Sequence, residues 1–151
     1  MSGSVLVLGG GIAGVQCALD LAEAGVKVVL VEREPTLGGK MAQLDKNFPT
    51  LDCSICIEAP KISEVVRHPN IEVLTLAELV SLEGTEGDFT AKIEQKARFV
   101  SDACTRCNEC SGVCPQVRAN EFDAGLGARK AIYTPAQQAE LRAGGLHVRA
   151  H

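Results

Sequence analysis

Four cysteines in the last third of the chain give its strongest chemical signal. Cys104, Cys107, Cys110 and Cys114 are followed by Pro115, in the pattern Cys-x2-Cys-x2-Cys-x3-Cys-Pro. Thiolates at this spacing lie on one concave turn and close around an iron–sulfur cube, and the proline then turns the chain away. The run predicts a [4Fe-4S] cluster and a role in electron transfer.

Two other uses of these cysteines are less consistent with the spacing. Zinc is usually held by two separated cysteine pairs, and a disulfide framework suits a short secreted chain. The fourth cysteine remains ambiguous, because in two-cluster ferredoxins it ligates the other cluster. No second complete run is present, so Cys114 either closes the same cube or serves another partner.

A glycine-rich turn near the start predicts a dinucleotide site. The apolar residues 5–8 run into Gly9-Gly-Gly11-Ile-Ala-Gly14. In such a turn Gly9 allows the tight bend, Gly11 lets the backbone approach a pyrophosphate, and Gly14 lets the next helix pack closely on the strand. The phosphates then meet the positive N-terminus of that helix.

The elements that must position this turn are a strand, a helix and a second strand. An apolar-periodic helix is expected through about Ala24, and Gly25 ends it. The second strand, residues 27–31, leads into Glu32, eighteen residues beyond Gly14. A carboxylate there can accept hydrogen bonds from an adenosine ribose. We therefore predict an α/β, Rossmann-like βαβ unit.

A second glycine pair favours FAD over NAD as the cofactor. Glu32 and Arg33 are followed by four residues and then Gly38, Gly39 and Lys40. This Glu-Arg-x4-Gly-Gly pattern resembles flavoproteins of the glutathione and thioredoxin reductase type, in which the chain passes close to bound FAD. An ordinary flexible loop is the alternative. Arg33 and Lys40 can meet cofactor oxygens, although solvated surface charge is the default for both.

Cys53 and Cys56 form a Cys-x2-Cys pair downstream of these glycines. A pair of this kind can be a redox dithiol that exchanges electrons with a flavin, or two ligands of an incomplete metal site. Two small hydrophobic residues in an apolar stretch are the alternative, and the motif alone does not decide. Cys17 is expected to be a buried, inert thiol on the packed face of the first helix.

Composition limits the partners. The chain has 151 residues, 46% hydrophobic content, a net charge of −4 and 3% aromatic residues, which gives no electrostatic or stacking footprint for nucleic acid. No apolar run approaches the length of a membrane span, and the first residues lack a signal-peptide pattern. Seven cysteines without a secretory signal favour the reducing cytoplasm.

The predicted organisation has three parts. Residues 1–100 form the FAD-binding portion, residues 101–120 a small ferredoxin-like module, and residues 121–151 a return segment with a divergent tail. Within the first part we expect a helix over 59–68, a strand over 71–76, and a hairpin of residues 79–82 and 89–94 around Gly84 and Gly87.

Several segments together resemble the A-type subunit of heterodisulfide reductase, an FAD- and [4Fe-4S]-containing iron–sulfur flavoprotein of anaerobes that is related to quinone-interacting oxidoreductases. The resemblance covers about residues 5–133. It is carried by Gly38-Gly-Lys-Met-Ala-Gln-Leu-Asp-Lys46, Leu51-Asp-Cys-Ser-Ile-Cys-Ile57, Arg67-His-Pro-Asn-Ile71, the cysteine run, and Asn120-Glu-Phe-Asp-Ala-Gly-Leu-Gly-Ala-Arg-Lys-Ala-Ile-Tyr133.

This resemblance implies an oxidoreductase subunit that relays electrons between FAD and a cluster and passes them to partner subunits or other redox proteins. Homo-oligomerisation is left open. Family members are much longer, and a later segment completes their flavin site, so this sequence matches an incomplete FAD domain. Two alternatives remain open: a truncated, non-catalytic remnant, and a dinucleotide-binding module whose cysteines hold zinc.

Overall fold

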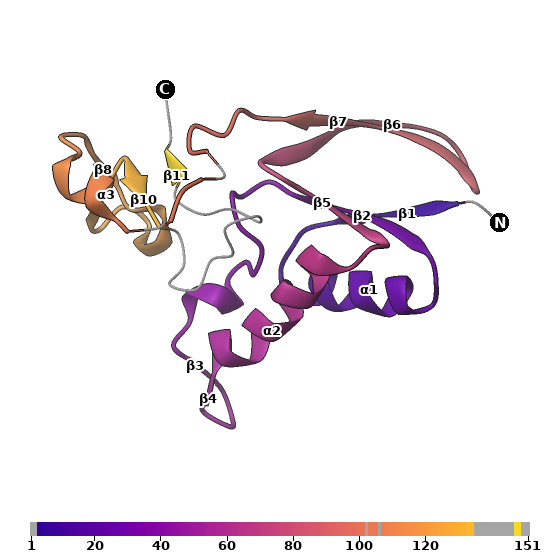
Figure 1. The fold of residues 1–151 in the computed structure, drawn as a ribbon, viewed down its shortest axis with the longest axis horizontal. Coiled ribbons are helices and arrows are strands. Elements are labelled where there is room, and N and C mark those ends of the chain that lie inside the picture. Colours follow the sequence, from indigo (N-terminus) through magenta and orange to yellow (C-terminus); the bar gives the residue numbers. More distant parts are fainter. Residues whose placement is uncertain (1–2, 102, 106, 135–146, 149–151) are drawn as a thin grey trace.

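The structure is a computed structural model that describes residues 3–101, 103–105, 107–134 and 147–148. Its main body is an α/β unit in which a parallel three-stranded sheet, ordered β1-β2-β5, packs on two helices (Figure 1). This confirms the predicted βαβ unit. The elements are β1 Ser4–Leu8, α1 Ile12–Glu23, β2 Lys27–Glu32, α2 Ser54–Arg67 and β5 Ile71–Thr75.

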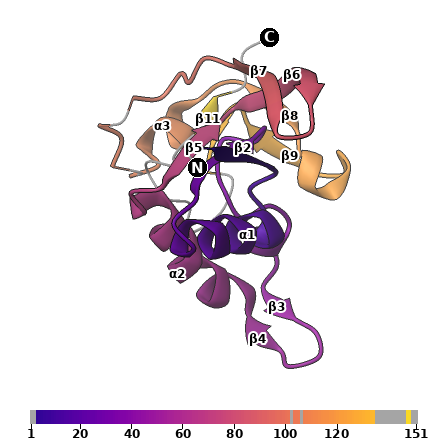
Figure 2. The ribbon, with the colours of Figure 1, turned by 90° about the vertical axis from the view of Figure 1, so that its right-hand side faces the viewer.

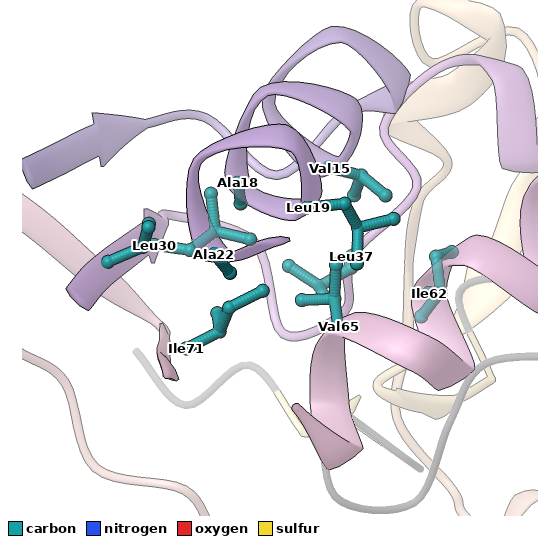
Figure 3. Packing of buried hydrophobic residues seen from close by; sticks show 10 residues of the cluster. Val15, Ala18, Leu19, Ala22, Leu30, Leu37, Ile62, Val65 and Ile71 are labelled. Atoms are coloured by element: carbon teal, nitrogen blue, oxygen red, sulfur yellow. The ribbon is translucent and has the colours of Figure 1, made fainter. Parts of the chain in front are cut away.

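The hydrophobic core lies between the sheet and the two helices, which cover the same face (Figures 1 and 3). The buried residues of α1 recur at the three- and four-residue spacing of one helix face. Strand β2 is central in the sheet, so its side chains are buried on both faces. The cluster consists of Val15, Ala18, Leu19, Ala22, Val28, Leu30, Leu37, Ile62, Val65 and Ile71.

The expectation for Cys17 is wrong. The thiol is exposed. The buried face of α1 passes through Val15, Ala18 and Leu19, and Cys17 points away from it. Ala13, one turn earlier on the same side as Cys17, is also exposed. Ala13 and Cys17 therefore lie on the solvent side of the helix, whereas Leu21, one turn further on, is partly buried and packs against the core.

Helix α2 begins five residues before the predicted start, at Ser54, so Cys53 is its N-cap residue. The Cys53 sulfur accepts a hydrogen bond from the Cys56 amide at 3.3 Å, which satisfies one unpaired N–H of the first turn. Pro60 lies inside the helix. The buried stripe of α2 consists of Ser54, Glu58, Ile62 and Val65.

Between β2 and α2 the chain forms a loop that contains the short 3-10 helix η1 Met41–Gln43 and the small hairpin of β3 Lys46–Asn47 and β4 Asp52–Cys53. We call residues 33–45 the flavin loop, after the cofactor that the sequence predicts for its glycine pair. After β5, the predicted hairpin is present as β6 Ala77–Thr85 and β7 Asp88–Gln95. Figure 2 shows it on the side of the sheet opposite the helices.

The cysteine run contains a short helix and is followed by two small antiparallel strand pairs. Strand β8 Val117–Ala119 pairs with strand β9 Ala128–Lys130. The two strands lie on opposite sides of the predicted domain boundary after residue 120. The part of the tail at 135–146 and 149–151 lies outside the described residues. These elements are α3 Glu109–Val113, β8 Val117–Ala119, η2 Glu121–Asp123, β9 Ala128–Lys130, β10 Ile132–Tyr133 and β11 His147–Val148.

Candidate functional site

The glycine turn joins the end of β1 to the start of α1. Gly9 adopts a left-handed φ of 102°, and its amide donates to the Val31 carbonyl of β2 at 2.8 Å. A Cβ at Gly14 would lie 1.8 Å from the Gly9 carbonyl oxygen, so any side chain there would clash with backbone. The tight packing of helix on turn therefore requires glycine at this position.

Gly11, the N-cap of α1, faces open space. A Cβ there would meet no atom within 4 Å. The first N–H groups of a helix have no partner within it, and they attract anions. An unfilled space above a helix N-terminus fits a pyrophosphate, so the geometry is compatible with FAD.

The second glycine pair packs directly against this turn. Gly38 donates its amide to the Gly10 carbonyl at 2.7 Å and forms a parallel bridge with Gly11. Gly38 has a φ of 110°, and a Cβ there would lie 2.6 Å from that of Ala42. A Cβ at Gly39 would lie 3.2 Å from the Gly11 Cα. The two predicted glycine motifs thus form a single cradle.

Glu32 closes this cradle at the end of β2. Its side chain is buried and accepts two backbone hydrogen bonds, from Gly10 at 2.6 Å and from Glu34 at 2.8 Å. An ionised carboxylate has about four acceptor sites. Glu32 can therefore organise the turn and still accept hydrogen bonds from ribose hydroxyls.

The two basic residues predicted near the cofactor are on the surface. Arg33 is 74% exposed, and its guanidinium lies 3.8 Å from the Glu34 carboxylate. Lys40 is exposed and lies at the edge of a cavity that Gly39 also lines. Neither side chain is fixed by the fold, so both remain predictions as cofactor contacts.

Cys53 and Cys56 form a disulfide at the N-terminus of α2, with their Cα atoms 5.2 Å apart. Cys53 is half-buried, and Cys56 is exposed. A helix N-terminus stabilises a thiolate. The pair is therefore placed for thiol–disulfide chemistry, and its role as a redox dithiol remains a prediction.

The four cysteines of the run are thiols rather than halves of disulfides. Cys107 is exposed, and Cys104, Cys110 and Cys114 are half-buried. Within the described part of the chain, no three Cys, His, Asp or Glu side chains are arranged to hold a metal ion. The donor set nevertheless fits a cluster, because four thiols lie within one short segment and iron–sulfur clusters are held by cysteine thiolates.

A cysteine binds a metal as its thiolate, and the surroundings of Cys114 favour that form. The backbone N–H of Ile132 bonds to its sulfur and lowers the pKa of Cys114 below the ordinary value, although desolvation opposes this effect. Amides of Gln116 and Ala131 and the charge of Lys130 act in the lowering direction. Lys130 also donates to the Cys114 carbonyl at 2.9 Å.

A half-open cavity of about 750 Å³ lies between the flavin loop, the start of α2 and the segment after the cysteine run. Cys53 and Gly39 line one side, and Asn120, Arg129 and Tyr133 line the other. This volume is in the range of ligand and cofactor pockets. The cavity therefore lies between the flavin loop and the segment that follows the cysteine run, and none of the four cysteines of that run is among its lining residues.

The wall contributed by residues 120–134 is fixed by a charged cluster. Arg129 donates to the Glu121 carboxylate at 2.6 Å, and its guanidinium lies 3.9 Å from the centre of the Tyr133 ring. The Arg129 side chain is only 10% exposed. A desolvated cation stacked on an aromatic ring is held more firmly than a surface ion pair, so this wall is a defined surface.

Comparison with known proteins agrees with this geometry. Residues 4–49 match the family described as FAD dependent oxidoreductase. The chain is 61% identical over 135 residues to the second A-type CoB--CoM heterodisulfide reductase iron-sulfur subunit of Methanopyrus kandleri. It is 56% identical over 137 residues to the corresponding A-type subunit of Methanocaldococcus jannaschii. The chain is a homologue of a segment of these heterodisulfide reductase subunits.

The match to the Methanopyrus protein covers 89% of this chain and 21% of that protein. The match to the Methanocaldococcus protein covers 90% of this chain and 21% of that protein. The chain thus spans about one-fifth of the length of these heterodisulfide reductase subunits. Among solved structures, L-proline dehydrogenase from P. horikoshii superposes with a TM-score of 0.50 at 23% identity, over 61% of this chain and 19% of that one. That likeness supports the α/β fold.

The sequence did not identify two parts of the site in this heterodisulfide reductase homologue. Residues 120–134 carry part of the family resemblance, yet nothing local indicated that they form a cavity wall. Glu58 was missed because α2 was expected to begin at residue 59. A helix predicted from Ser54 would have placed Glu58 on the buried stripe with Ile62 and Val65, where a charged residue is unusual. No helix in the described ranges is long and apolar enough to cross a membrane.

Proposed function

We propose that the chain is the electron-transfer part of a heterodisulfide-reductase-like protein, and that it binds FAD and a [4Fe-4S] cluster. The observation that carries the proposal is the shared cavity. One wall belongs to the flavin loop, and the other follows the cysteine run by a few residues. A flavin beside the first wall and a cluster on the cysteine run, a few residues before the second wall, would lie on one body, which is what electron transfer between them requires.

Each residue has a specific part in this proposal. Gly9, Gly11 and Gly14 hold the FAD pyrophosphate at the start of α1, and Glu32 binds the ribose. Gly39 forms the second side of the cradle, and Arg33 and Lys40 lie at its edge. Cys104, Cys107, Cys110 and Cys114 hold the cluster. The Cys53–Cys56 pair is a redox dithiol beside the flavin, Cys53 lining the cavity and Cys56 facing solvent.

The residues set position, while FAD and the cluster supply the electron-transfer chemistry when bound. The sequence shows no catalytic triad and no paired-carboxylate motif. We therefore propose that the electrons leave to partner subunits that hold the substrate, and that this takes place in the cytoplasm. The names of the relatives, which are heterodisulfide reductase subunits, support this assignment.

Anaerobic purification of the full chain, followed by cofactor analysis, tests the proposal. We expect about four irons per chain, a broad band at about 400 nm and flavin absorbance at about 450 nm, because cysteine-bound clusters and FAD both absorb there. A reductive titration should bleach both bands. Zinc in place of iron would support the zinc-module alternative, and a colourless protein without metal or flavin would indicate a non-catalytic remnant.

A further inference from the structure

Glu58 is a fully buried carboxyl group that no hydrogen bond explains. Its residue has 0% exposure, and within the described chain neither carboxyl oxygen has a hydrogen-bond partner. It lies on the apolar stripe of α2, with Ser54 one turn before it and Ile62 one turn after it. An unpaired buried polar group costs free energy, so a native protein retains one only for a reason.

The position of Glu58 indicates what that reason is. A Cβ built on Gly38 would lie 3.4 Å from the Glu58 Oε2 atom. Gly38 in turn is hydrogen-bonded to Gly10 and bridged to Gly11, which borders the proposed pyrophosphate site. The carboxyl therefore lies next to one of the glycines that form the cradle.

Desolvation alone raises the pKa of Glu58 to about 7, from the ordinary 4.5. Several charged residues lie on α2 and on the elements packed against it, but none contributes to this shift. They are Asp20 and Glu23 on α1, Lys40 and Asp45 on either side of η1, Asp52 on β4, Glu72 on β5, and Lys61, Glu64 and Arg67 on α2. The pKa of this carboxyl is therefore raised by its burial. Gly38 of the flavin loop lies next to the carboxyl, so its burial depends on the position of that loop.

We propose that Glu58 is a positioning residue of the flavin site: as a neutral carboxylic acid it lets Gly38 close on the phosphate-binding turn, so that FAD binds with uptake of a proton. The inference rests on the proposed binding of FAD. An ionised carboxylate needs water, which it can reach only if the loop lifts away. It would also repel the doubly charged pyrophosphate held beyond Gly38.

The proposal predicts a proton-linked affinity. FAD affinity of the full chain should fall by about tenfold between pH 6 and pH 8.5, which corresponds to a rise of about one unit in the pKa of Glu58 on binding. Glu58→Gln keeps the shape and stays neutral, so its affinity should match wild type at pH 6 and remain flat. Titration calorimetry in buffers of different ionisation enthalpy should show proton uptake near pH 7 for wild type only.

A matched control comes from the same helix. Glu64 is exposed, so Glu64→Gln should keep the full pH dependence of the wild-type chain. If Glu58→Gln does not fold, Glu58→Leu provides a second neutral side chain, and its FAD affinity should likewise be independent of pH. A merely structural role for Glu58 would change affinity without changing its dependence on pH.

A second measurement does not require FAD. The folded pKa of Glu58 is raised, so between pH 4.5 and about 7 the unfolded chain binds fewer protons than the folded chain. Stability must therefore fall as pH rises through this window. The unfolding midpoint of wild type should drop relative to that of Glu58→Gln from pH 5 to pH 8.

The outcomes separate this inference from the proposed function. If wild type and Glu58→Gln bind FAD with parallel pH profiles, the role of Glu58 is overturned while the flavin site stands. If neither binds FAD at any pH, the proposed function fails and this inference fails with it.

Discussion

A chain with Cys107 replaced by serine should lose essentially all of its cluster iron, from about four atoms per chain to background. Cys107 is the middle residue of the three-cysteine turn, and its thiol is exposed and outside any disulfide. A serine hydroxyl stays protonated near neutral pH and cannot replace a thiolate as a ligand. Iron and acid-labile sulfide should be measured after anaerobic reconstitution, together with absorbance at about 400 nm.

Cys17→Ser is the matched control. This thiol is also exposed, but it lies on α1 outside the cysteine run, so its loss should leave the iron content unchanged. Retention of about four irons by the Cys107→Ser chain would show that the assignment of this turn as the cluster site is wrong.

Gly11→Val should abolish flavin binding, reducing FAD affinity by about a hundredfold or more, while the fold and the cluster survive. Gly11 is extended, with φ −75° and ψ 178°, so valine fits its backbone. Its Cβ would meet no protein atom, and it would occupy the space assigned to the pyrophosphate. An overlap of this kind can cost about 3 kcal/mol even where packing adjusts, and about 3 kcal/mol corresponds to about a hundredfold in affinity. Flavin and iron content of the same sample are the measurement.

Gly14→Ala provides the contrast. The added methyl would lie 1.8 Å from the Gly9 carbonyl oxygen, so this change should lower the unfolding temperature of the whole α/β unit. Circular dichroism during heating separates the two variants. Equal FAD occupancy in Gly11→Val and wild type would remove this turn from the cofactor site.

The α/β unit was predictable because its signals are local. The turn from Gly9 to Gly14 and the acid at Glu32 follow from spacing, and the hairpin around Gly84 and Gly87 follows from alternating strands. In the structure the same residues also contact one another, as when Glu32 accepts the Gly10 amide. Local and tertiary preferences agree here.

The features that were missed depend on tertiary packing. Periodicity placed Cys17 on a helix, but which face of α1 is buried depends on α2 and β5. Arg129 and Tyr133 lie far in sequence from Gly39, and the chain must fold before they share a cavity. Glu58 contradicts the apolar stripe it occupies, and residues of this kind are expected at functional sites.

The central claim, electron transfer between the flavin and the cluster, is tested most directly by stopped-flow spectroscopy of the anaerobically reduced full chain. The reduced chain should be mixed with a blue-copper electron-transfer protein, a one-electron acceptor too large to enter the cavity and with its main absorption away from the flavin and cluster bands, so that both bands can be followed separately. We expect both bands to reoxidise together in wild type, and flavin reoxidation to slow by at least about tenfold in Cys107→Ser, because cofactors carry the electrons and the protein sets their separation. Flavin reoxidation at the wild-type rate in a Cys107→Ser chain that lacks its cluster would contradict the relay.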